Sequence, residues 1–150
     1  MKPESRFTNS VNVYLKSKVY FEKMNNPFRA GTADFWYRGN NGDCWIEYKV
    51  IPAIPTRTTI LPDLSARQLK WLNDRADEGR KVYVVVGHPK GGVVWPIGLD
   101  QPMQPAAFEK LSLTRPQLAA WILGITGESP CRSPKSCSPS SESCPPDKRS

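Results

Sequence analysis

One stretch, residues 31–50, constrains the fold more than any other part of the chain, because it reads as two strands joined by a tight turn. Its sequence is GTADFWYRGNNGDCWIEYKV. Both halves are rich in aromatic and β-branched residues, which favour strands. The connection between them, residues 38–43, holds two Gly and two Asn, which tolerate the positive φ of tight turns. The sequence therefore predicts a β-hairpin.

The alternation of side chains in the second strand, residues 44–50, decides which groups share a face of the sheet. Successive side chains point to opposite faces, so Trp45, Glu47 and Lys49 share one face. The opposite face then holds Cys44, Ile46, Tyr48 and Val50. Glu47 and Lys49 would lie roughly 6–7 Å apart along the strand. Pairing of the two strands brings Asp34 near the same end, which places two carboxylates and one amine at one point.

These three charged groups suit metal-assisted hydrolysis of a phosphodiester. Mg²⁺ prefers oxygen ligands and keeps several waters, so Asp34 and Glu47 can hold it and leave positions open for a phosphate and a water. The metal polarises the phosphate and lowers the pKa of the attacking water. Lys49 would orient that water or stabilise the charge on the phosphate, and the backbone carbonyl of Tyr48 is a third candidate ligand. The alternative is a surface hairpin with a Glu47–Lys49 ion pair worth about 0–1 kcal/mol.

The motif formed by G-T-A-D at 31–34 and I-E-Y-K at 46–49 resembles that of the PD-(D/E)xK nuclease superfamily. Over about residues 20–87 the chain is similar to the virus-type replication-repair branch (VRR-NUC) and to small Holliday-junction resolvases. Ala33 departs from the pattern, which usually has Pro there, but that Pro shapes the backbone and does no chemistry. The resemblance implies an α/β fold with a restriction-endonuclease-like αβββαβ core, in which helices flank a mixed central sheet. It also implies DNA cleavage that depends on Mg²⁺ or Mn²⁺.

Residues 3–16 predict an amphipathic helix that begins near Pro3. Its predicted buried stripe consists of Phe7, Val11, Tyr14 and Leu15. Many members of the superfamily carry a Glu on the first helix that completes the metal site, so the resemblance makes Glu4 a candidate ligand. Glu22, in a strand predicted at residues 19–23, is its rival. The alternative for Glu4 is a favourable charge at a helix N-terminus.

Residues 65–79 predict a helix that begins with an S-x-x-Q capping box, formed by Ser65 and Gln68. Gln68 also falls where the nuclease branch carries a Gln that positions the scissile phosphate or its water. The resemblance therefore implies a catalytic role for Gln68, whereas the capping box explains the residue without one. Both roles stay open at this point.

The remaining segments are predicted from composition and periodicity. They are a proline-containing loop at 51–59, a buried strand at 81–86, a turn at 87–92, a strand at 93–95, and helices at 104–111 and 115–124. The single histidine, His88, is predicted to be a turn residue rather than a catalytic one. Residues 127–150, rich in Ser and Pro, predict a disordered tail. Its cysteines are too widely spaced for an ordinary zinc site.

The formal net charge of +7 indicates an anionic partner, and +6 of it lies in residues 1–126. Five basic residues near the motif are candidate DNA contacts, with solvated surface charge as the alternative: Lys23, Arg29, Arg57, Arg67 and Lys70. No signal peptide and no apolar run of about 18–20 residues is visible, which predicts a soluble, cytoplasmic protein with no membrane contact.

The sequence thus predicts one nuclease-like domain at residues 1–126, followed by the tail at 127–150. The expected function is a metal-dependent endodeoxyribonuclease, structure-specific and active in repair, recombination or phage DNA processing. A homodimer is a further expectation, drawn from the symmetric cutting of two strands by resolvases. The alternatives are a nucleic-acid-binding module without catalysis and a protein-interaction factor.

Overall fold

The structure, a computed structural model, describes residues 1–24 and 31–128. Its elements follow one another along the chain as α1 (Pro3–Asn12), β1 (Tyr20–Lys23), β2 (Phe35–Gly39), β3 (Gly42–Val50), α2 (Ala66–Asp77), β4 (Val82–His88), β5 (Gly91–Val94), α3 (Pro105–Leu111) and α4 (Arg115–Thr126). The predicted αβββαβ core is confirmed, and it is extended by β5, α3 and α4. None of the helices in the described part of the chain has the length and apolarity that crossing a membrane requires.

The five strands form one mixed sheet in the order β1-β2-β3-β4-β5. The predicted hairpin is β2 and β3, whose last pair, Gly39 with Gly42, flanks the turn residues Asn40 and Asn41. Only β3 and β4 run parallel. A parallel pair needs a long crossover, which α2 provides between the two strands.

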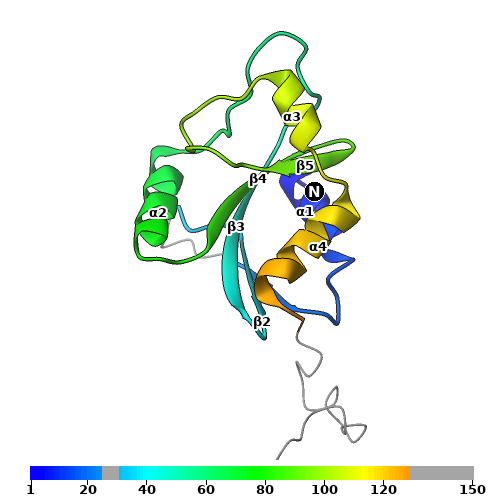
Figure 1. Cartoon of the computed structure of the whole chain (residues 1–150), viewed down its shortest axis with the longest axis vertical. Coiled ribbons are helices and arrows are strands. Elements are labelled where there is room, and N and C mark those ends of the chain that lie inside the picture. Colours follow the sequence, from blue (N-terminus) through cyan, green and yellow to red (C-terminus); the bar gives the residue numbers. More distant parts are fainter. Residues whose placement is uncertain (25–30, 129–150) are drawn as a thin grey trace, which may run out of the picture.

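The helices lie on both faces of the sheet, with α2 on one side and α1 and α4 on the other (Figure 1). Between the sheet and α1 and α4 lies a core cluster that includes Phe7, Val11, Tyr37, Tyr48 and Ile122. A second cluster, on the α2 face, includes Leu72, Val84, Val86, Trp95 and Phe108. The predicted alternation in β3 is confirmed, because Cys44 and Ile46 belong to the first cluster and Trp45 packs against the second.

Two helices begin at the capping boxes that their sequences encode. The side chain of Ser65 accepts from the backbone N–H of Gln68 at the start of α2, and Thr114 does the same for Gln117 at the start of α4. Each pair satisfies backbone donors that the first helical turn leaves without partners. The predicted N-terminus of each helix is therefore confirmed.

The first helix is shorter than predicted, since α1 ends at Asn12 rather than continuing to residue 16. Beyond it, the backbone N–H groups of Tyr14 and Leu15 bond to carbonyls three residues earlier, a tighter winding than the α-helix. The tighter winding changes which side chains face the core. Leu15 is fully buried, whereas Tyr14 is 46% exposed, so its predicted place in the buried stripe is wrong.

His88 is the last residue of β4 rather than part of the following turn, so the predicted position is corrected. Its Nδ1 accepts from the backbone N–H of Lys90 at 3.3 Å, which leaves the ring proton on Nε2. Nε2 then donates to Ser112 Oγ at 2.6 Å. In this tautomer the pair of His88 and Ser112 serves to hold β4 to the segment after α3.

Candidate active site

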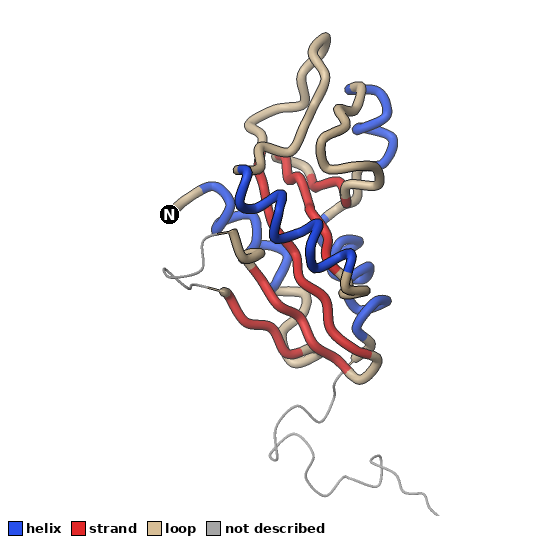
Figure 2. The backbone as a smooth tube through the Cα atoms, turned by 90° about the vertical axis from the view of Figure 1, so that its left-hand side faces the viewer, coloured by secondary structure: helices blue, strands red, loops and turns tan. Residues whose placement is uncertain are grey.

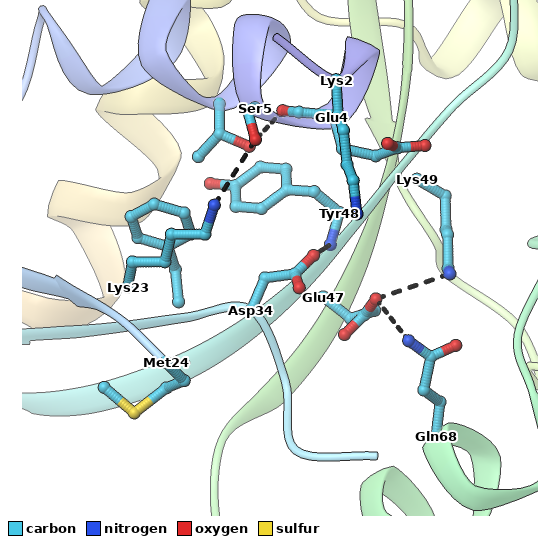
Figure 3. Close-up of a pocket in the computed structure, with 12 residues that line it drawn as sticks. Lys2, Glu4, Ser5, Lys23, Met24, Asp34, Glu47, Tyr48, Lys49 and Gln68 are labelled. Atoms are coloured by element: carbon cyan, nitrogen blue, oxygen red, sulfur yellow. Dashed lines mark hydrogen bonds and ion pairs between the residues drawn. The ribbon is translucent and has the colours of Figure 1, made fainter. Parts of the chain in front are cut away.

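The site residues come together because of the register between β2 and β3. Phe35 pairs with Ile46 in the antiparallel ladder, so the next residues outward, Asp34 and Glu47, lie opposite each other. Asp34 Oδ2 accepts from the backbone N–H of Tyr48 at 3.1 Å, which fixes its carboxylate against β3 (Figure 3). The predicted convergence of the two carboxylates is what the structure shows.

Glu47 is a buried carboxylate whose two oxygens have different surroundings. The side chain is 2% exposed. Oε2 accepts from Gln68 Nε2 at 2.9 Å and lies 3.6 Å from Lys49 Nζ (Figure 3). Oε1 is buried without a hydrogen-bond partner in the described part of the chain. Because a buried acceptor without a partner is costly, a proton or a cation bound at this oxygen would remove that cost.

The surroundings of both carboxyl groups favour binding of a proton or a cation. Burial, reinforced by the charge of Asp34, raises the pKa of Glu47 to about 8, although Lys49 opposes the shift. Burial also raises the pKa of Asp34, against the hydrogen bond from Tyr48 and the charge of Lys49. Two facing carboxylates in a partly buried site favour either a bound proton or a bound cation.

A divalent metal ion fits this donor set. Carboxylate oxygens are the ligands that Mg²⁺ and Mn²⁺ prefer, and the unpartnered Oε1 of Glu47 lies beside Asp34. Within residues 1–24 and 31–128, no three His, Cys, Asp or Glu side chains lie close enough together to hold one ion. Asp34 and Glu47 would therefore share the ion with waters, a phosphate oxygen or a backbone carbonyl. The carbonyl of Tyr48 stays a prediction in this role.

The carboxylates open onto a cavity of about 370 Å³ between the sheet and the start of α1. Asp34, Glu47, Lys49 and Gln68 line it. The other lining residues are Lys2, Glu4, Ser5, Thr8, Lys23, Met24, Phe35 and Tyr48. Glu4 thus lies on the cavity, whereas its rival Glu22 is exposed on β1 and accepts from Tyr20 Oη at 3.2 Å. Glu4 does not lie close enough to Asp34 and Glu47 to hold one ion together with them, so its predicted place as a metal ligand is not reproduced, although it lines the same cavity.

Gln68 completes the capping box and also contacts the candidate site, while its predicted role in positioning the phosphate or its water stays a prediction. Its Oε1 accepts from the backbone N–H of Ser65 at 3.0 Å and completes the capping box. Its Nε2 donates to Glu47 across the site. The cap thereby orients the amide so that its donor end faces the carboxylate.

The candidate DNA contacts differ in where they lie. Lys23 lines the cavity, and its Nζ donates to Ser5 Oγ at 3.4 Å. Arg57, Arg67 and Lys70 are exposed and do not line the cavity, and Lys70 is paired with Asp74 at 2.9 Å. Arg29 lies outside the described residues.

Lys2 is a cavity residue that sequence reasoning missed. It immediately precedes α1 and extends from the start of that helix toward the cavity (Figure 3). Periodicity could not identify it, because it lies outside the helix. The sequence held one indication that Lys2 could reach the site, because Lys2 lies within one helical turn of the candidate ligand Glu4.

Comparison with known proteins supports the fold. No family model matches the chain, and no curated protein matches it. Among solved structures, it is similar to Hjc from Archaeoglobus fulgidus, described as a Holliday junction resolvase from an archaeal hyperthermophile. The TM-score is 0.51 at 18% identity, over 77% of this chain and 98% of the other. The mixed five-stranded sheet flanked by helices is therefore similar to the fold of that protein, and small resolvases are one of the groups that the sequence motif resembles.

Proposed function

We propose that this protein is a metal-dependent DNA endonuclease. The observation that carries the proposal is the Asp34–Glu47 pair, in which Glu47 is buried with one unpartnered carboxylate oxygen, next to Lys49 and Gln68. The resolvase-like fold supports it, because the fold and the motif point to the same class of protein independently. The net charge of +7 supports a nucleic-acid substrate.

In the proposed mechanism, Asp34 and Glu47 would hold Mg²⁺ or Mn²⁺, which polarises the scissile phosphate and lowers the pKa of the attacking water. Gln68 fixes Glu47 Oε2, which leaves Oε1 for the ion. The Lys49 side chain is 22% exposed and places its ammonium at the mouth of the site. There it can orient the water and stabilise the charge that develops on the phosphate.

We further propose that the enzyme is structure-specific and acts in DNA recombination or repair. This step rests on the name of the similar structure, a Holliday junction resolvase. Homodimer formation, a phage origin and membership of the VRR-NUC branch are hypotheses that no observation on this chain yet tests.

The decisive experiment measures nicking of labelled four-way junctions and linear duplexes with Mg²⁺, with Mn²⁺ and with EDTA. We expect the wild type to cleave DNA only when the metal is present, and we expect Glu47→Gln to lower the nicking rate by about 10²-fold or more. Glu22→Gln is the matched control, because Glu22 is an exposed carboxylate that does not line the cavity. Wild-type-like cleavage by Glu47→Gln would overturn the proposal. Junction binding by a wild type that never cleaves would instead identify a binding module.

A further inference from the structure

A row of aromatic side chains continues from the carboxylate pair along the same face of the sheet. Trp36 pairs with Trp45 in the β2–β3 ladder, two residues from Asp34 and Glu47 respectively. Residues two apart on a strand point to the same face. The two indole rings lie 5.9 Å apart at an interplanar angle of 30°.

This row has one further aromatic ring at each end. Tyr20 of β1 packs edge-on against Trp36 at 5.9 Å, and Trp71 of α2 packs edge-on against Trp45 at 5.5 Å. We call Tyr20, Trp36, Trp45 and Trp71 the aromatic row. It runs across the sheet from its β1 edge to α2, beside the candidate active site.

The β1 end of the aromatic row is not part of the protein core. Trp45 and Trp71 pack against the cluster beneath α2, but Trp36 and Tyr20 belong to neither core cluster. Trp36 is half-buried and Tyr20 is 40% exposed. In Figure 2, α2 crosses the sheet in front, and the strands at the left edge, β1 and β2, extend beyond it. Adjacent aromatic side chains that no element of the described chain covers are candidates for a contact site.

The groups around Trp36 suit a nucleobase. The guanidinium of Arg38 lies 5.9 Å from the centre of the Trp36 ring. In the described part of the chain no acidic side chain forms an ion pair with Arg38. Trp36 Nε1 donates to Asp43 Oδ2 at 2.7 Å, which fixes the plane of the indole. Aromatic rings and arginine planes are the surfaces on which unpaired bases stack, and the free cation favours a phosphate backbone nearby.

We propose that the β1 end of the aromatic row, formed by Trp36 and Tyr20, stacks unpaired bases of the DNA strand whose phosphate lies at the carboxylate pair. The location of that phosphate rests on the proposed function. Residues two apart on a strand are separated by roughly 6–7 Å, a distance that a nucleoside can span from its phosphate. A fully paired duplex keeps its base faces stacked inside. The inference therefore defines the substrate class as DNA with unpaired nucleotides next to the cut.

The stacking is tested by binding in EDTA, so that it does not depend on catalysis. The probes are a fluorescently labelled oligothymidylate and a labelled blunt duplex, followed by anisotropy. We expect Trp36→Ala to weaken oligothymidylate binding by roughly 5- to 100-fold and duplex binding by less than about 3-fold. Trp36→Phe, which keeps a stacking ring, should stay within about 3-fold of the wild type for both probes.

Tyr20→Ala is the second variant, because an exposed residue can be truncated without unfolding the protein. Its matched control is Tyr14→Ala, since Tyr14 is a similarly exposed tyrosine that lies outside the row, just after α1. We expect Tyr20→Ala, and not Tyr14→Ala, to weaken oligothymidylate binding. Unchanged binding in both Tyr20→Ala and a folded Trp36→Ala, or equal losses for both probes, would overturn the inference.

The outcomes separate this inference from the proposed function. A wild type that binds oligothymidylate through Trp36 and Tyr20 but never cleaves DNA would overturn the nuclease and support the stacking surface. Metal-dependent cleavage, together with oligothymidylate binding that neither Trp36→Ala nor Tyr20→Ala weakens, would support the nuclease and overturn the stacking surface.

Discussion

Gln68 and Glu47 are joined by a hydrogen bond of 2.9 Å, from Gln68 Nε2 to Glu47 Oε2, which ties the first turn of α2 to β3. The other end of the same amide accepts from the backbone of Ser65. Because Oε1 is engaged by the cap, Nε2 has to point toward Glu47. A feature of helix initiation thus orients a side chain of the candidate site.

Substitutions at Ser65 and Gln68 should separate the cap from the site. Ser65→Ala removes the Oγ acceptor and is expected to cost about 1 kcal/mol of stability. It keeps the backbone N–H that holds Gln68 Oε1, so cleavage should be little changed. Gln68→Ala loses both contacts and should reduce cleavage by roughly 10-fold or more. Thermal melting and nicking rates check this, and equal loss of activity in both variants would contradict it.

The stability of the metal-free protein should depend on pH through Glu47. Its pKa is about 8 in the folded protein against 4.5 for a free side chain, so between these values the folded state binds more protons than the unfolded state. The contribution of protonated Glu47 to the free energy of unfolding is fully present below about pH 4.5, and it is lost as the pH rises through about 8. Melting in EDTA should show wild type losing stability relative to Glu47→Gln across this range. A constant difference would contradict the burial argument.

Addition of a divalent ion should reverse that loss. A ligand that binds only the folded state stabilises it, and the deprotonated pair binds it best. At pH 8, Mg²⁺ or Mn²⁺ should therefore raise the melting temperature of the wild type more than at pH 5.5. Glu47→Gln is the control and should respond weakly at both pH values.

Lys23 should contribute more to DNA binding than Lys70, although both are lysines near the motif. Lys23 lines the cavity, whereas Lys70 is paired with Asp74 on α2. Loss of one phosphate contact in Lys23→Ala should lower the salt-dependence slope of duplex binding by about 0.9. Lys70→Ala should leave the slope unchanged. The two slopes are compared by titration in EDTA over a range of NaCl, and identical slopes would place Lys23 away from the DNA.

Substitution of glycine by alanine should have opposite effects on stability at Gly91 and at Gly124. A Cβ at Gly91 would overlap the backbone oxygen of Leu113, so Gly91→Ala should disturb the junction of β5 with the segment before α4. A Cβ at Gly124, within α4, would meet nothing within 4 Å. Gly124→Ala should therefore stabilise the protein by about 0.5–1 kcal/mol. Chemical denaturation of the two variants measures both effects.

Features that depend on neighbours in the chain could be predicted from the sequence. The hairpin, the alternation along β3 and the capping box at Ser65 each follow from spacings of a few residues. The parallel pairing of β3 with β4 agrees with the presence of α2 between them, because a parallel pair needs a long crossover. The error at Tyr14 arose where the winding changed after α1, because a periodic pattern assumes constant winding.

The sequence by itself determined that Asp34, Glu47 and Lys49 would meet, since strand alternation and hairpin register follow from local order. Only the tertiary structure placed Lys2 and Glu4, but not Glu22, on the cavity, and it placed Tyr20 and Trp71 at the ends of the aromatic row. It also decided the burial that raises the pKa of Glu47. The physical reason is that these contacts join elements distant in the chain, and their packing is set by the whole core rather than by neighbouring residues.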